Sequence, residues 1–444
     1  MKHIKKLISV ALAAALLAAV PVGCSKPSDS SASTSGKTTS PKKLIWLTQS
    51  PGPDPSSWEV LLKPTLEKYN KENNVNITGE YYSFNDMFQV VQVKIAAGNS
   101  DYDILSVDGP MVANYAYHNY ITPMDQYFTQ AEKDKIATPS LKASMYDNKL
   151  YAPPMNTSSQ VLYYNKDLLA KANITVPNSD VNHRLTWDQV VDMAKKTLAV
   201  VDPNGQKAIS GIVFEQLNRT YQMCALPNSL GEKSISNDGL SADGVINNAG
   251  WVKALTWYQN LYKEGLSRKG LTADNSSSNF KSGKIIFEVG GTWNDVGFAK
   301  TKVNFGYAPC PTFKGYESKV ATPTDSWHFG IVKGSKNSDE AAKFIKYMTI
   351  GEGNTEWLKA NGDVPSTKEA LDAISKDTKT SGVMKIAAYE AQHTAVPRAL
   401  TAGYTEYSTV MDQTFSDIEN GADVKTSVDK AVNQIDSALS KYKK

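Results

Sequence analysis

The feature that most constrains this chain is a regular alternation of strand-like and helix-like segments after residue 42. Residues 43–48, 76–84 and 102–109 are rich in β-branched and aromatic residues, as strands are. The stretches between them, one ending at about residue 73 and one covering residues 85–98, carry helical patterns. This alternation predicts an open, mostly parallel α/β sheet. A chain of 444 residues is too long for one ordinary core, so we expect two or three domains.

Helix starts can be read from capping boxes, in which a side chain before the helix and one three residues later each satisfy a backbone N–H. The expected helix starts are Ser56-x-x-Glu59, Thr186-x-x-Gln189 and Asn337-x-x-Glu340.

Ligands of open α/β sheets bind beyond the carboxyl ends of the strands. In the first three predicted strands these ends hold Gln49, Ser50, Phe84 and Asp108. The alternatives are ordinary structural roles. Asp108 precedes Gly-Pro and suits a turn, Phe84 suits strand packing, and Gln49 suits a plain loop.

The stretch KIIFEVGGTWN, residues 284–294, ends a strand in two glycines and then presents Trp293. A tryptophan after a strand is most often packing, but an indole held beyond a glycine turn also offers a flat face for stacking. The polar run NTSSQ, which contains Ser158, suits a crossover between two lobes, and Trp327 lies where the chain crosses again. Arg398 and Tyr404 flank a late stretch interrupted by Pro and Gly.

The N-terminus indicates export. Lys2, Lys5 and Lys6 precede an apolar run of about 14 residues, which is short of the roughly 20 needed to span a bilayer. Without these three lysines the chain has 45 basic and 45 acidic side chains. We therefore expect a nearly neutral mature protein with no role in nucleic-acid binding.

The segment after Cys24 is rich in Ser and Thr and predicts a flexible tether over residues 24–42. With Cys24 set aside, Cys224 and Cys310 remain as either a disulfide or two buried free thiols.

Several chemistries lack their sequence signatures. The five histidines are isolated, so no metal site is indicated. No nucleophile elbow, phosphate loop or dinucleotide fingerprint occurs, and paired carboxylates of a glycosidase cannot be recognised from sequence. We expect no cofactor.

Several runs resemble the extracellular solute-binding proteins of family 1, the substrate-binding lipoproteins of carbohydrate ABC importers, which include maltose-binding proteins. These runs are YDILSVDG, LYAPPMNTSSQVLYYNKDLL, FKSGKIIFEVGGTWNDV, VNFGYAPCPTFKG and FGIVKGSKNSDEAAKFIKYM. The resemblance covers residues 43–442. It implies a two-lobed periplasmic-binding-protein-like fold (type II), each lobe a mostly parallel sheet flanked by helices, with a hinge and a ligand cleft between them.

The resemblance also implies roles for single residues. Trp293 matches the aromatic that stacks on a sugar ring, and Asp108 matches an acid that accepts sugar hydroxyls. Cys24 matches the lipid-modified cysteine of a lipobox, Pro21-Val22-Gly23-Cys24, in which Pro21 stands where the family usually has Leu. The remaining expected ligand contacts are Trp327, Arg398, Tyr404, Phe84, Gln49 and Ser158.

The implied protein is a monomer, lipid-anchored at the extracellular face of the cell membrane, that captures a carbohydrate by hinge closure and delivers it to ABC permease subunits. The resemblance implies no catalysis. The alternatives are an exported carbohydrate-active hydrolase and a surface sugar receptor that feeds a sensor. Its expected parts are a signal peptide (1–23), a tether (24–42), lobe one (43–157 and 322–355) and lobe two (158–321 and 356–444).

Overall fold

Two four-stranded sheets organise the part of the chain that the structure, a computed structural model, describes: residues 40–50, 57–98, 101–380 and 382–443. Residues 41–444 form one compact unit. The expected signal peptide, Cys24 and nearly all of the tether lie outside the described residues.

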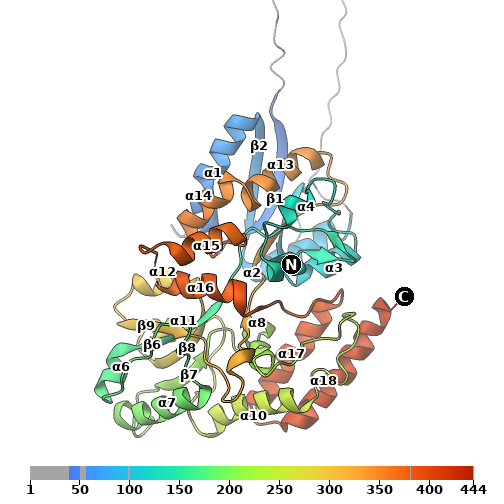
Figure 1. Cartoon of the computed structure of the whole chain (residues 1–444). Helices are drawn as coiled ribbons and strands as arrows, with labels where there is room; N and C mark the ends of the chain where they lie inside the picture. The colour runs from blue at the N-terminus through green and yellow to red at the C-terminus, as the bar shows by residue number, and fades with distance from the viewer. Residues whose placement is uncertain (1–39, 51–56, 99–100, 381, 444) are drawn as a thin grey trace, which may run out of the picture. The chain divides into compact units, whose positions relative to one another are not determined.

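The first sheet has the strand order β11-β3-β1-β2. β1 (Lys42–Gln49) pairs in parallel with β2 (Val75–Tyr82) and β3 (Ile104–Asp108), whereas β11 (Trp327–Ile331) runs antiparallel to β3. Helices α1 (Trp58–Asn73), α13 (Ser338–Thr349) and α14 (Glu352–Asn361) pack beside it (Figure 1). Buried aromatic rings join these helices to the sheet, because Trp46 of β1 contacts Phe344 of α13 at a centroid distance of 5.8 Å.

The second sheet has the order β7-β8-β6-β9. β7 (Ser210–Phe214) is parallel to β8 (Ile285–Gly291), and β6 (Gln160–Asn165) is antiparallel to both β8 and β9 (Phe305–Pro309). Every residue of β6, β7 and β8 is buried, as expected for strands covered on both faces. In each sheet three strands therefore share one direction and one strand opposes them.

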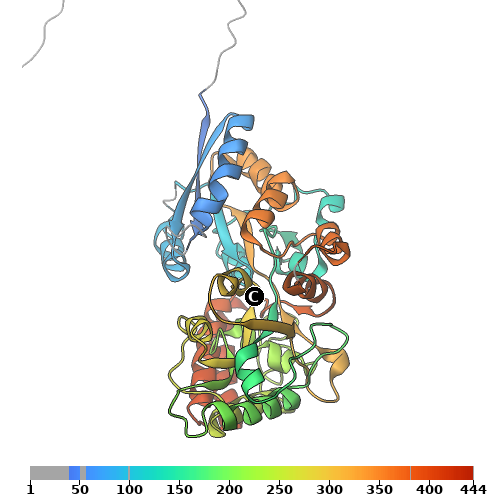
Figure 2. The same cartoon turned by 90° about the vertical axis from the view of Figure 1, so that its left-hand side faces the viewer.

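The chain crosses between the sheets before β6, again around β10 (Thr322–Pro323), and a third time at β12 (Ala395–Val396). β10 and β12 pair in parallel, Thr322 with Ala395, so the second and third crossings lie side by side. Figure 2 shows the two sheets with their helices as separate lobes joined by these strands. The opposed strands β6 and β11 are the first strands after the first and second crossings.

The remaining elements surround the two sheets and the crossings. They are α2 (Phe84–Val90), a π-helix (Val91–Ile95), α3 (Met111–Tyr117), α4 (Gln130–Lys133), α5 (Thr138–Ala143), β4 (Met145–Tyr146), β5 (Lys149–Leu150), α6 (Lys166–Lys171), α7 (Trp187–Val201), α8 (Thr220–Met223), α9 (Ala225–Asn228), α10 (Ala249–Lys263), α11 (Ser276–Lys281), α12 (Asn294–Ala299), 3-10 turns Glu317–Lys319 and Ser440–Tyr442, α15 (Lys368–Lys376), α16 (Gly382–His393), α17 (Tyr404–Glu419) and α18 (Val424–Leu439). None of the helices within the described residues combines the length and apolarity of a membrane span.

The helix caps were predicted with mixed success. Thr186 and Gln189 form the expected capping box of α7. Asn337 is the N-cap residue of α13, as expected, but its side chain makes no cap hydrogen bond. Its amide nitrogen instead donates to the backbone oxygen of Lys43 and to Asp103, each at 3.1 Å. Ser56 lies outside the described residues, and α1 has Ser57 at its N-cap position.

The expected boundary between residues 355 and 356 falls inside α14. Trp357 of this helix is fully buried and lies 5.1 Å, between ring centroids, from Trp58 of α1. We therefore propose that lobe one extends to the end of α14.

Candidate ligand-binding site

Two adjoining cavities lie at the carboxyl ends of strands from both sheets. The larger has a volume of about 630 Å³ and the smaller about 180 Å³. Both are lined by Asp108 at the end of β3 and by Gln216, two residues after β7. Residues from both sheets thus face one space, the arrangement expected for a ligand held between two lobes.

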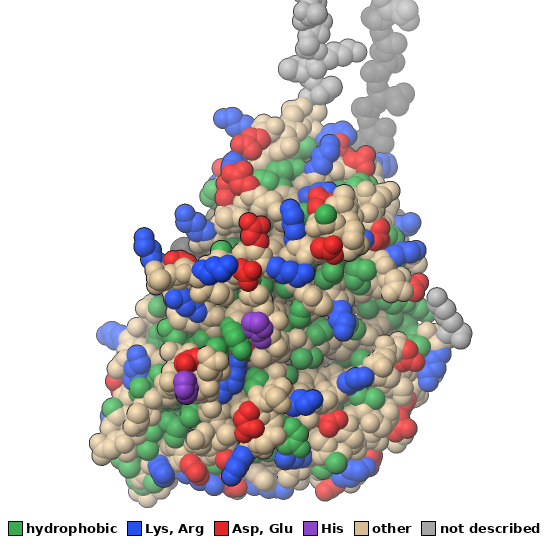
Figure 3. Space-filling model, in the orientation of Figure 1, with side chains coloured by type: hydrophobic (Ala, Val, Ile, Leu, Met, Phe, Trp, Pro, Cys, Tyr) green, Lys and Arg blue, Asp and Glu red, His purple; other side chains and the backbone are tan. Residues whose placement is uncertain are grey.

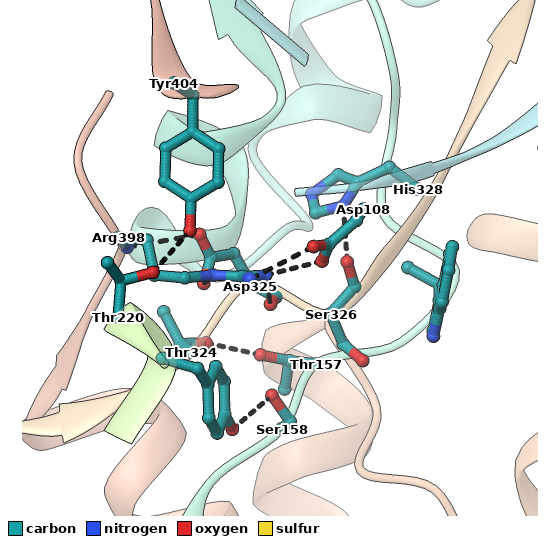
Figure 4. A network of polar contacts seen from close by, with 12 residues as sticks. Asp108, Thr157, Ser158, Thr220, Thr324, Asp325, Ser326, His328, Arg398 and Tyr404 are labelled. Atoms are coloured by element: carbon teal, nitrogen blue, oxygen red, sulfur yellow. Dashed lines mark hydrogen bonds and ion pairs between the residues drawn. The ribbon is translucent and has the colours of Figure 1, made fainter. Parts of the chain in front are cut away.

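Arg398 is the centre of a buried ion-pair network at this space (Figure 4). Its guanidinium binds both carboxylate oxygens of Asp108, with Nη1 to Oδ2 at 3.0 Å, and its Nε lies 3.4 Å from Oδ1 of Asp325. The side chains of Arg398 and Asp108 are only 11% and 10% exposed, and that of Asp325 is fully buried. Because Asp108 ends β3 and Arg398 follows β12, the network joins the first sheet to the third crossing.

The network contains one guanidinium, that of Arg398, and two carboxyl groups, those of Asp108 and Asp325. Burial raises the pKa of Asp325 to about 7, against the opposing effect of Arg398 and with a further raise from Asp108. Burial opposes the charge of Arg398, but Asp108 and Asp325 outweigh it and raise the pKa of the guanidinium. Arg398 also lies 5.4 Å from the ring of Tyr221 and 5.9 Å from that of Tyr404, both aromatic faces that favour a cation.

Trp293 stands immediately before α12 and remains 38% exposed, as a stacking surface requires. Its indole Nε1 donates a hydrogen bond to Oε1 of Glu215 at 2.9 Å, and its ring centroid lies 5.6 Å from that of Tyr221. The ring lies directly over Gly291, where a Cβ would approach indole Cζ2 to 2.1 Å. A residue with any side chain at 291 would exclude this ring position.

Glu215, which follows β7, is the anchor of that indole. Its carboxyl accepts from Trp293 and, at 2.7 Å, from the backbone N–H of Gly291. Burial raises the pKa of Glu215, and these two hydrogen bonds oppose the shift.

Trp327 and Phe84 form an aromatic wall on the first lobe. Trp327, opposite Asp108 in the β3–β11 register, lies edge-on to Phe84 at 6.0 Å and to Trp58 at 5.6 Å. Phe84 begins α2, is 38% exposed, and has the guanidinium of Arg219 at 5.7 Å from its ring.

The other expected residues are placed as follows. Gln49 ends β1 and lines the smaller cavity together with Ser158. Ser158 is buried and accepts a hydrogen bond from the hydroxyl of Tyr221 at 2.8 Å. Tyr404 begins α17, is buried, and has its hydroxyl 2.7 Å from that of Thr220.

The profile of the family described as bacterial extracellular solute-binding protein matches residues 65–385. The chain belongs to this family.

The names of three relatives of this solute-binding protein each refer to a different ligand. The maltodextrin-binding protein MdxE of Bacillus subtilis (strain 168) is 24% identical over 85% of this chain and 87% of its own length. A galactooligosaccharide-binding protein of the same strain is 22% identical over 83% and 84%. The sn-glycerol-3-phosphate-binding periplasmic protein UgpB of Rhizobium meliloti is 26% identical over 66% and 69%.

Solved structures confirm the two-lobed α/β fold of this solute-binding protein. An ABC substrate-binding protein from Listeria monocytogenes in complex with cycloalternan matches with a TM-score of 0.75 at 19% identity, covering 90% of this chain and 99% of the other. A maltotriose-binding protein of Thermus thermophilus matches with a TM-score of 0.71 at 20% identity, covering 89% and 100%. Family membership confirms the prediction of a binding protein and not an enzyme.

Sequence reasoning missed several residues of the solute-binding site. Glu215 could have been found by the rule that selected Asp108, because each is an acid at the carboxyl end of a strand. Asp325, at a positive φ of 60° in the second crossing, had only the weak signal of a polar segment before a strand. The missed residues with charged or aromatic side chains that line the larger cavity are Phe88, Tyr115, Arg219, Tyr221 and Asp412.

The side chains that line the cavities are suited to binding a ligand. Within the described residues, no group of three or more His, Cys, Asp or Glu side chains could hold a metal ion. The chemistry that the site does offer is aromatic faces, carboxyl acceptors and guanidinium donors.

Proposed function

We propose that this chain is the sugar-binding component of an ABC importer, anchored by a lipid on Cys24 at the outer face of the cell membrane. The observation that carries the sugar proposal is the partly exposed indole of Trp293, fixed by Glu215 at a cavity that Asp108 and Arg398 also line. Sugars present apolar C–H faces that complement an indole and hydroxyls that need planar polar partners.

Hinge closure is supported by the positions of the residues that line the smaller cavity. Asp108 ends a strand of the first sheet, whereas Trp293 follows a strand of the second, so a ligand that touches both side chains stabilises the closed arrangement. The parallel pair β10–β12 and the segment before β6 are the parts of the backbone at which the lobes turn. In this proposal the protein acts as a monomer, and its closed form delivers the bound ligand to the ABC permease subunits.

The first experiment is a thermal-shift screen with neutral mono- and oligosaccharides, because a ligand that binds the folded state alone raises the melting temperature. Calorimetry with the best sugar should then show that W293A binds about 30-fold more weakly, since an indole face contributes about 2 kcal/mol of buried apolar contact. Equal affinity of W293A and the parent would contradict the stacking role.

The anchor is tested separately. In cells, the C24S variant should leave the membrane fraction and appear in the soluble exported fraction, whereas the parent should stay with the membrane. A parent protein found soluble outside the membrane would overturn the anchor and leave the sugar proposal intact.

A further inference from the structure

The larger cavity has two unlike walls. Its first-lobe wall comes from α2 and the π-helix and is made of aromatic, apolar and amide side chains: Phe84, Asn85, Phe88, Gln89, Gln92 and Val93. Its second-lobe wall includes the face of α17 that bears Tyr404, Ser408 and Asp412, spaced four residues apart and therefore on one side of the helix. Apolar contacts and hydrogen-bonding groups thus face each other across the space.

Asp412 is the charged member of the α17 face and has an incomplete set of contacts. Its Oδ1 is buried and finds no hydrogen-bond partner among the residues that the structure describes. A buried carboxyl oxygen without a donor is costly, and a ligand that supplies the donor removes that cost.

Two arginines lie near Asp412, but the ion pairs that they form are with other acids. Burial raises the pKa of Asp412 to about 7, against the smaller opposing effects of Arg219, of a hydrogen bond from the backbone of Thr220 and of Arg398. Arg398 is already bound to Asp108 and Asp325. The ion pair that Arg219 forms is with the exposed Asp274 at 3.7 Å.

The charged side chains lining the two cavities are three acids, Asp108, Asp325 and Asp412, and two arginines, Arg219 and Arg398. Above about pH 7, where Asp325 and Asp412 are ionised, an anionic ligand entering this space meets more carboxylates than guanidinium groups, and Arg398 is already bound to two of these carboxylates.

We propose that Asp412 binds a hydrogen-bond donor of the ligand, a hydroxyl or a protonated amino group, and that the cleft thereby selects neutral or amino sugars against phosphorylated and acidic ones. This inference rests on the proposed sugar-binding function. It adds a polar ligand contact in the larger cavity, which Trp293 does not line.

The test is calorimetry with six probes of defined charge: glucose and galactose trisaccharides, maltotetraose, a glucosamine disaccharide, digalacturonate and sn-glycerol 3-phosphate. The parent protein should bind a neutral or amino probe and neither acidic probe. D412N should weaken the best-bound probe by about 10-fold or more, the size expected for a hydrogen bond to a charged group. The matched control is D417N on the same helix, whose carboxyl is hydrogen-bonded to Gln413 at 2.7 Å and does not line either cavity.

A second readout does not depend on the folding of D412N. R219Q removes a positive charge beside Asp412, so it should tighten binding of the glucosamine disaccharide and leave digalacturonate unbound. Unchanged affinity in a folded D412N, or tight binding of either acidic probe by the parent, would overturn this inference while leaving the sugar function standing. A parent protein that bound none of the probes would contradict the sugar function, and the inference would fall with it.

Discussion

The indole Nε1 of Trp293 and the buried carboxyl of Glu215 are joined by a hydrogen bond of 2.9 Å. Because the same carboxyl also accepts the backbone N–H of Gly291 at 2.7 Å, it ties the end of β7 to the turn after β8. The hydrogen bond to Glu215 therefore fixes the orientation of the partly exposed ring before a ligand binds. Binding then does not have to immobilise this side chain.

The first prediction concerns this anchor. E215Q offers only one acceptor oxygen to two donors, so one N–H loses its partner, and the free energy of unfolding should fall by about 1–2 kcal/mol. Urea unfolding measures that loss, and calorimetry should show weaker sugar binding. In a W293F background, which lacks the indole N–H, the same substitution should cost less, and equal costs in both backgrounds would contradict the coupling.

The second prediction concerns Gly291. A methyl group there would lie 2.1 Å from indole Cζ2, so G291A must move the ring of Trp293 out of its position. We expect G291A to lose sugar affinity about as much as W293A and to keep its far-ultraviolet circular dichroism. G297A is the control, because a Cβ at that half-buried helical glycine approaches no atom outside its own helix closer than 3.6 Å.

The parts of the site that follow strand ends could be predicted from the sequence, because strand ends are local features. Gln49, Asp108 and Trp293 were selected in this way, and all three line a cavity. Asp412 carries no such signal, since its position at the cavity depends on how α17 packs against segments some 300 residues earlier in the chain.

The two α/β sheets were predicted from the same local patterns, but the direction of β6 and β11 was not. A strand that follows a crossing between lobes takes its direction from the crossing and not from its own composition. The missing side-chain cap bond at Asn337 has a similar cause, because its amide nitrogen donates to Lys43 and Asp103, which are distant in sequence.

The third prediction is a dependence of stability on pH that arises from Asp325. Its folded-state pKa of about 7 lies above the ordinary value of 3.8, so between these values the folded protein keeps a proton that the unfolded chain releases. Its contribution to the free energy of unfolding is therefore largest below about pH 4 and is lost as the pH rises to about 7, by at most about 1.4 kcal/mol per pH unit.

D325N should remove this part of the slope. Asparagine tolerates the positive φ of 60° at this position, so the substitution does not strain the backbone. Denaturant unfolding of both proteins at pH 5, 6, 7 and 8 measures the difference, and parallel curves would show that Asp325 does not titrate in this range.

The fourth prediction concerns the two cysteines. Cys224 and Cys310 are free and buried, with different neighbours: the sulfur of Cys224 lies 3.8 Å from the hydroxyl of Tyr407, and that of Cys310 accepts from Gln160 at 3.1 Å. Burial raises the pKa of each thiol to about 12, so neither forms the reactive thiolate at neutral pH. In a C24S background, a thiol reagent should therefore label neither cysteine quickly in the folded protein and both after unfolding. Dithiothreitol should leave the melting temperature unchanged, whereas a disulfide between them would contribute about 2–5 kcal/mol and its reduction would lower the melting temperature by several degrees.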